Sequence, residues 1–368
     1  MKSHLEVRRR LVGALCAAAW PGATRAQDAA APTAASAPPR RWIGLPRVAG
    51  RLTSADIGLV VNRADPYSIE VGAAYRRARH LRPDQVLDVD LPRQARLPED
   101  DFRRLAERIG GHFGRTTQAL ALAWQLPFAV GCSSITGALA LGLDEALCRN
   151  SCAASRRSPY FGAPSLRPMA ELGMRLSMLL AADSVDGALA MIERGVAADA
   201  SLGRRGAPAA TAQFLVGDDE QRSVRDAAYP PPGRLQPANV EIRVDHRSTP
   251  GDAERVLLVQ VGRSHVERLD AVRFVPGALA DHLTSTGGAI DASTPQMTAL
   301  AWIAAGATAS HGTVSEPCAR AEKFPHPQLL LLTYLQGCTA IEAYWRSVAC
   351  PQQSLFVGEP LAAPFARA

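Results

Sequence analysis

Short apolar runs of strand length alternate with helical segments along the chain, and this alternation constrains the fold most strongly. The first run, residues 57–61, is followed by Asp65 and Pro66, which suit the N-cap and the first position of a helix. Apolar residues then recur at helical spacing from Val71 to Ala78. A strand followed by a turn and a helix is typical of sheets whose parallel strands are joined by helical crossovers.

The same pattern returns along most of the chain. It predicts further strands at 85–89, 119–124, 213–216, 256–261, 272–275 and 354–357. It predicts further helices at 102–113, 185–196 and 297–304, with a last helix opened by the capping box of Thr339 and Glu342. We therefore predict an α/β fold in which a mostly parallel sheet carries helices on both faces, giving three layers. The pattern lapses at 132–180, which we interpret as a cysteine-bearing insertion after the third strand.

The N-terminal residues have the features of an export signal. Residues 1–26 combine three consecutive arginines, a short apolar run and a small residue at a plausible cleavage point; a buried N-terminal helix is the alternative. Both the general and the twin-arginine export routes fit this segment. Residues 27–50 are rich in alanine and proline, so we expect a flexible tether before a single α/β domain at 51–368. These features predict a periplasmic or secreted protein.

The charge balance argues against a nucleic-acid partner. The chain has 41 Lys and Arg against 35 Asp and Glu, and residues 1–26 account for five of the basic residues and one acidic residue. The remainder therefore carries 36 basic against 34 acidic residues, which is close to neutral. No later apolar stretch reaches the length of about 20 residues that a membrane-spanning helix needs.

The cysteines predict disulfide bonds. Loss of residues 1–26 would remove Cys16 and leave six cysteines in two groups of three: 132, 148 and 152, then 318, 338 and 350. If all six pair, at least one bridge joins the two groups. A metal site or a free catalytic thiol is the alternative, but Cys148 and Cys152 have no second ligand pair nearby. We expect no metal and no cofactor, because the phosphate-binding and dinucleotide-binding glycine motifs do not occur.

Candidate functional residues were taken from the positions that follow the predicted strands, where parallel sheets bind ligands. Acid–base chemistry is possible for Asp281, His282, His311 and Glu316, which we take as tentative catalytic residues. The candidate binding residues are Asn62, Asp65, His265, Thr284 and Ser285. Each also has a structural interpretation: Asp65 as a helix cap, and the others as polar residues of turns and loops.

Several sequence strings resemble those of a family of uncharacterised exported bacterial proteins. They are VNRADPYS from Val61, RGVAADA from Arg194, DHLTSTGG from Asp281, GATASHGTVSEPC from Gly306, KFPHP from Lys323, EAYWRSV from Glu342 and VGEPLAAPF from Val357. More remotely, the order of elements is similar to that of gingipain-type cysteine peptidases. This resemblance implies a caspase-like fold.

The peptidase resemblance also implies where a catalytic pair would lie. Those enzymes place a His-Gly pair after one inner strand and a nucleophilic cysteine after the next. By position these would fall near Gly262-Arg263 and near Ala280, and neither residue type is present there. The leading hypothesis is therefore a non-proteolytic binding or structural protein that recognises an unknown extracytoplasmic ligand or protein. The alternative is a hydrolase whose site is built from Asp281, His282, His311 and Glu316.

Overall fold

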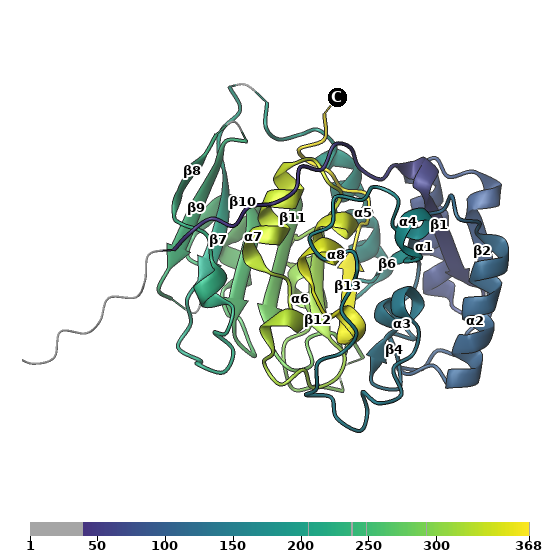
Figure 1. The fold of residues 1–368 in the computed structure, drawn as a ribbon. Coiled ribbons are helices and arrows are strands. Elements are labelled where there is room, and N and C mark those ends of the chain that lie inside the picture. The colour runs from purple at the N-terminus through teal and green to yellow at the C-terminus, as the bar shows by residue number, and fades with distance from the viewer. Residues whose placement is uncertain (1–39, 205, 237, 248, 292, 368) are drawn as a thin grey trace, which may run out of the picture. The chain divides into compact units, whose positions relative to one another are not determined.

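The computed structural model of the chain describes residues 40–367 except 205, 237, 248 and 292 (Figure 1). The predicted export signal and residues 27–39 of the predicted tether lie outside the described residues. The described part is a mixed α/β structure in which a large, mostly parallel sheet is flanked by helices. Within it, no helix combines the length and the apolar character needed to cross a membrane.

The elements follow one another in three stretches. The first contains β1 (Ile57–Asn62), α1 (Pro66–Ala78), β2 (Val86–Val89), α2 (Glu99–His112) and β3 (Ala119–Leu122). The second contains β4 (Ala129–Val130), β5 (Ser133–Ser134), α3 (Ile135–Leu141), α4 (Pro168–Leu172), β6 (Leu176–Leu179) and α5 (Val185–Ala198). The third contains β7 (Ala210–Leu215), β8 (Gly233–Leu235), β9 (Val240–Asp245), β10 (Ala253–Gly262), β11 (Val272–Leu283), α6 (Ala299–Ala304), β12 (Ala309–Thr313), α7 (Pro327–Leu335), α8 (Ala340–Ser347) and β13 (Ser354–Gly358).

The sheet has eleven strands in the order β2-β1-β3-β6-β13-β12-β11-β10-β7-β9-β8. Pairing is parallel from β2 to β6 and from β12 to β9, whereas β13 is antiparallel to β12 and β8 is antiparallel to β9. Strands β6 and β13 share a single residue pair, Val357 with Leu179. The two parallel groups end at the same edge, because Ser315, after β12, donates to the Cys132 carbonyl, after β3, and Arg96, after β2, donates to the Val314 carbonyl. The carboxyl ends of β1, β11 and β12 therefore share one edge, in agreement with the expectation, and β13 is reversed between the two groups.

Continuous apolar sequence explains the central strands. All six residues of β1 are buried, as expected for a strand covered on both faces. Asp65 caps α1 by accepting a hydrogen bond from the Tyr67 amide, and Thr339 with Glu342 caps α8 as predicted. Two histidines show the layers: His282 of β11 accepts a hydrogen bond from Trp302 of α6, whereas the ring of His311 in β12 stacks on Tyr344 of α8, at 6.5 Å.

Strand β11 extends eight residues beyond its predicted end. Pro276 and Gly277, which follow the predicted strand 272–275, lie in an irregularity of the pairing with β10: Phe274 pairs with Val256, and Leu279 pairs with Leu258. Proline is tolerated at such an irregularity because no ladder hydrogen bond is required of it. Asp281 and His282 are therefore inside β11, and His311 is inside β12, rather than in the loops that follow these strands.

Two segments differ from their predicted roles. The predicted insertion at 132–180 supplies β6, which lies between β3 and β13 near the middle of the sheet. Residues 40–50, part of the predicted tether, are held against α7. The Ile43 amide donates to Gln328 Oε1 at 2.9 Å, and the Val48 amide donates to Gln336 Oε1 at 2.6 Å. The amides of residues 43 and 48 thus find acceptors on glutamines far along the chain.

Candidate functional site

A cavity of about 550 Å³ lies at the carboxyl ends of β11 and β12. Three segments line it: residues 221–224 after β7, residues 283–285 at the end of β11, and residues 316–319 after β12. Because β7, β11 and β12 all run in the same direction, their following segments meet at this edge. This is the position at which open parallel sheets commonly bind ligands.

The first wall depends on a close backbone approach. The segment that contains Arg222 packs against the end of β10, where a β-carbon at Gly262 would collide with the Arg222 carbonyl. Arg222 itself forms an ion pair with Asp219, at 2.6 Å, and its Nε donates to Thr284 Oγ1 at 3.4 Å. These contacts place a guanidinium group at one side of the cavity, next to the end of β11.

The opposite wall is fixed by a disulfide. Cys318 is bonded to Cys152, and this bridge joins the early and the late cysteine groups. Cys318 and Ala319 both have positive φ, at 58° and 52°, a conformation that costs free energy in residues other than glycine. The Cys318 amide also donates to Glu316 Oε1, at 2.6 Å. A thiol at position 318 is therefore not available as a nucleophile.

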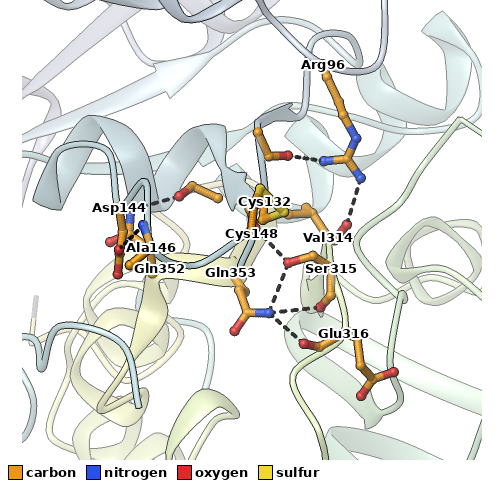
Figure 2. Close-up of a disulfide and its surroundings, with 12 residues drawn as sticks. Arg96, Cys132, Asp144, Ala146, Cys148, Val314, Ser315, Glu316, Gln352 and Gln353 are labelled. Carbon is orange, nitrogen blue, oxygen red and sulfur yellow. Dashed lines mark hydrogen bonds between the residues drawn. A yellow bond between two sulfur atoms is a disulfide. The ribbon is translucent and has the colours of Figure 1, made fainter. Parts of the chain in front are cut away.

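A second group of hydrogen bonds fixes residues 314–316, and Figure 2 shows these bonds. Ser315 Oγ donates to the Cys132 carbonyl at 2.6 Å, beside the Cys132–Cys148 disulfide. The Gln353 amide group donates to the Glu316 carbonyl at 2.9 Å. The Glu316 side chain projects away from these contacts (Figure 2), and it is exposed. The other two cysteines of the described chain, Cys338 and Cys350, are free and buried.

Two hydroxyl groups lie at the tip of β11. Thr284 Oγ1 donates to Gln296 Oε1 at 2.8 Å, so its proton is already engaged. Ser285 is half-buried and lines the cavity, and the loop that carries it is fastened to β12 because Thr313 Oγ1 donates to the Ser285 carbonyl at 2.9 Å. The cavity thus presents a cation, a carboxylate and hydroxyl groups on a rigid frame.

Asp281 belongs to a buried polar group beside the cavity. It forms an ion pair with Arg225, at 2.6 Å, and accepts a hydrogen bond from Gln260 Nε2 at 2.8 Å. Burial raises the pKa of the Asp281 carboxyl, and the neighbouring Arg225 and Gln260 oppose this shift. Both carboxylate oxygens are engaged and the side chain is fully buried, so Asp281 is not among the residues that line the cavity.

His282 faces the opposite side of the sheet from Asp281. Its Nε2 donates to the Met297 carbonyl at 2.9 Å, and its Nδ1 accepts a hydrogen bond from Trp302 Nε1 at 3.0 Å. Burial lowers the pKa of His282 to about 4, so the ring is neutral at pH 7. With both nitrogens engaged, the imidazole cannot accept a proton from a ligand without breaking these bonds.

His311 is enclosed by aromatic rings. The rings of Phe324, Tyr344 and Phe356 lie 5.9, 6.5 and 5.5 Å from it, and neither of its nitrogens has a hydrogen-bond partner among the described residues. Burial lowers the pKa of His311 well below its ordinary value. Its backbone pairs with that of Asp281, but no hydrogen bond joins the two side chains in the described part of the chain.

The four tentative catalytic residues therefore do not meet in the cavity. Only Glu316 lines it, together with the predicted binding residues Thr284 and Ser285. Asn62 and Asp65 lie at the end of β1, and four strands (β3, β6, β13 and β12) separate β1 from β11; the Asn62 amide group donates to the Leu91 carbonyl at 3.0 Å. Residues 40–367, so far as they are described, contain no group of three or more His, Cys, Asp or Glu side chains arranged to hold a metal ion.

Two features of the site were not anticipated. Arg222 follows β7 in a run of polar residues, 218–222, and the rule that selected the other candidates would also have selected this segment. His265, which was selected, is exposed and is not among the residues that line the cavity. The positive φ values at 318 and 319 have no signal in the sequence, because neither residue is a glycine or an asparagine.

Comparisons with known proteins add little to this geometry. No protein-family model matches the chain, and no curated protein matches it. Among solved structures, a solute-binding protein of an ABC transporter from Mycobacterium smegmatis, with bound glycerol, shares 10% identity over 84% of this chain and 95% of that one, with a TM-score of 0.17. A likeness at this level carries neither a fold nor a function over to the present chain.

Proposed function

We propose that the protein is an exported, non-proteolytic binding protein on a caspase-like fold, and that the cavity at the ends of β11 and β12 is its ligand site. The observation that carries this proposal is that the groups suited to catalysis are engaged elsewhere. Cys318 is in a disulfide, and both nitrogens of His282 make hydrogen bonds inside the fold. The side chains that line the cavity are suited to binding a ligand, because they offer charged and hydroxyl groups in fixed positions.

The gingipain resemblance is consistent with this view of the cavity. It implies a nucleophile after one inner strand and His-Gly after its neighbour, and the corresponding strands here are β11 and β10. Because β11 continues to Leu283, the position of the nucleophile moves from Ala280 to Thr284 and Ser285. On this resemblance, the cavity would correspond to the substrate site of such an enzyme, and hydroxyl residues would stand where a cysteine is needed.

The ligand should be a small molecule or short peptide segment with both charge signs. Arg222 and Glu316 come from opposite walls, and Ser285 lies on the segment between them. Leu283, Val224 and neighbouring residues add apolar contact area, which does not select particular chemical groups of the ligand. Export is supported by the two disulfides, because such bonds form and persist in oxidising compartments.

Two assays on the same purified protein test the proposal. Thermal-shift titration with a panel of free dipeptides, whose termini carry both charges, should give at least one stabilising ligand. The shift should be lost in Arg222→Gln and Glu316→Gln and kept in the matched controls Arg103→Gln and Glu99→Gln, which remove an exposed pair on α2. Hydrolysis of fluorescein-labelled casein and of p-nitrophenyl acetate should not exceed that of Ser285→Ala. Turnover that Ser285→Ala abolishes would favour the hydrolase instead.

A further inference from the structure

A second concave surface lies at the edge of the sheet opposite the cavity. It is a groove of about 690 Å³ lined by Leu45, by residues that precede β7 and β9, by the carboxyl-terminal half of α7 with Gln336, and by residues 365–367 after the last strand. Because β7 and β9 run parallel to β11, residues before them lie at the edge where these strands begin, away from the cavity at the end of β11. The groove therefore shares no residue with the proposed ligand site.

The floor of the groove is apolar. Its side chains come from five separate parts of the chain and are only partly buried, apart from the phenylalanine: Leu45, Leu202, Leu235, Leu332, Leu335 and Phe365. These residues extend the hydrophobic core outward, since Leu202, Leu235 and Leu335 pack against it. An apolar surface of this kind, left open to solvent in a concave site, is suited to an apolar chain.

The rim of the groove is strongly basic. Arg204 and Arg367 line the groove itself. Two smaller hollows adjoin it: one shares Arg367 and adds Arg47 and Arg51, and the other shares Arg204 and adds Arg234. No aspartate or glutamate lines any of the three.

These five arginines also lack partners of opposite charge. Among the residues that the structure describes, none of them forms an ion pair with a carboxylate, whereas Arg103 on α2 pairs with Asp100 and Arg243 on β9 pairs with Glu241. Arg204 Nε donates to the Ala200 carbonyl at 2.8 Å, and this bond leaves its terminal nitrogens free for a ligand. A concentration of unpaired guanidinium groups attracts an anion, and it does so more strongly beside a surface of low dielectric constant.

We propose that this groove binds a single-chain anionic amphiphile of the fatty-acid class, with its alkyl chain on the leucine floor and its head group at the Arg204 and Arg367 guanidinium groups. The arginine-rich rim favours an anionic ligand. The apolar floor favours an anion that carries an alkyl chain over a free inorganic anion. The concave shape favours one chain from solution over the flat surface of a bilayer. The proposal is independent of the proposed function, because the two sites lie at opposite edges of the sheet.

Isothermal titration of the full chain with sodium laurate, below its micelle concentration, tests the proposal. Laurate should bind, acetate should not, and dodecyl maltoside, which has the same chain with a neutral head, should bind at least tenfold more weakly. Shortening the chain by two carbons should lower the affinity on the order of tenfold. If laurate gives no binding, or if laurate and dodecyl maltoside bind equally, the proposal is overturned.

Variants locate the site. The pair Arg204→Gln and Arg367→Gln should reduce laurate affinity about tenfold, and Leu332→Glu should abolish binding while circular dichroism and melting temperature stay those of the wild type. The matched control Arg103→Gln, on α2, should bind laurate as the wild type does. Unchanged affinity in the double arginine variant would refute the assignment. If the protein does not bind laurate but co-sediments with phosphatidylglycerol vesicles, the proposal is overturned, and the groove would instead contact a membrane surface.

Discussion

Acidification should destabilise the protein through His282. The imidazole is fully buried, and its pKa is lowered from 6.5 to about 4 mainly by that burial. In the unfolded chain the ring takes up a proton near pH 6.5, whereas in the folded protein it stays neutral down to about pH 4. The unfolded state therefore binds more protons in this interval, and stability is lost as the pH falls through it.

The size of the effect follows from the difference between the two pKa values. At about 1.4 kcal/mol per pKa unit, the full contribution of His282 is about 3 kcal/mol, of which about 2 kcal/mol is lost between pH 7 and pH 5. The lowered pKa of His311 acts in the same direction, so the wild-type loss should be larger than that of His282 alone.

Urea unfolding at pH 7 and pH 5 measures this contribution. His282→Gln should be less stable than the wild type at pH 7, because Gln cannot reproduce both ring hydrogen bonds, but its loss of stability between the two pH values should be smaller by about 2 kcal/mol. His265→Gln is the control, since His265 is exposed, and it should keep the wild-type pH dependence. If His282→Gln loses as much stability as the wild type on acidification, the assignment of a neutral, buried imidazole is refuted.

Two further substitutions test the packing that positions the cavity and the sheet. Gly262→Ala would place a β-carbon against the Arg222 carbonyl, and urea unfolding should show a loss of about 1–3 kcal/mol, whereas Gly114→Ala, with no atom within 4 Å, should be nearly neutral; equal stabilities would contradict the close approach. Arg79 donates to both oxygens of the buried Glu359, at 2.8 and 2.7 Å, so Arg79→Met should cost about 3–5 kcal/mol by leaving that charge unpaired. Adding Glu359→Met should restore much of the loss, and a double variant no more stable than the single one would argue against this pair.

The sequence predicted the elements better than their arrangement. Apolar runs and caps identify β1, α1 and α8 because both signals are local: burial of every residue in β1, and side chains that satisfy free amides at a helix start. Counting required a bridge between the early and late cysteines only if all six pair; Cys152–Cys318 joins the two groups, while Cys338 and Cys350 are free. The direction of β13 has no local signal, so the sequence alone does not show that this strand runs antiparallel to β12 between two groups of parallel strands.

The candidate site was predicted in part for a related reason. Thr284, Ser285 and Glu316 were selected by their place after a strand, and they line the cavity. Asp281 and His311 were selected by the same rule with strand ends set too early, so they are inside the sheet. A proline within an irregular strand pair looks, in sequence, the same as a proline that ends a strand.

The most direct test of the central claim, that the cavity wall carries no reactive thiol, is a map of the cysteines. The protein, unfolded without reductant, would be treated with iodoacetamide, digested and analysed by mass spectrometry. We predict alkylated Cys338 and Cys350, and a disulfide-linked pair of peptides that contains Cys152 and Cys318. Alkylation of Cys318 would place a free thiol at the cavity and contradict the account.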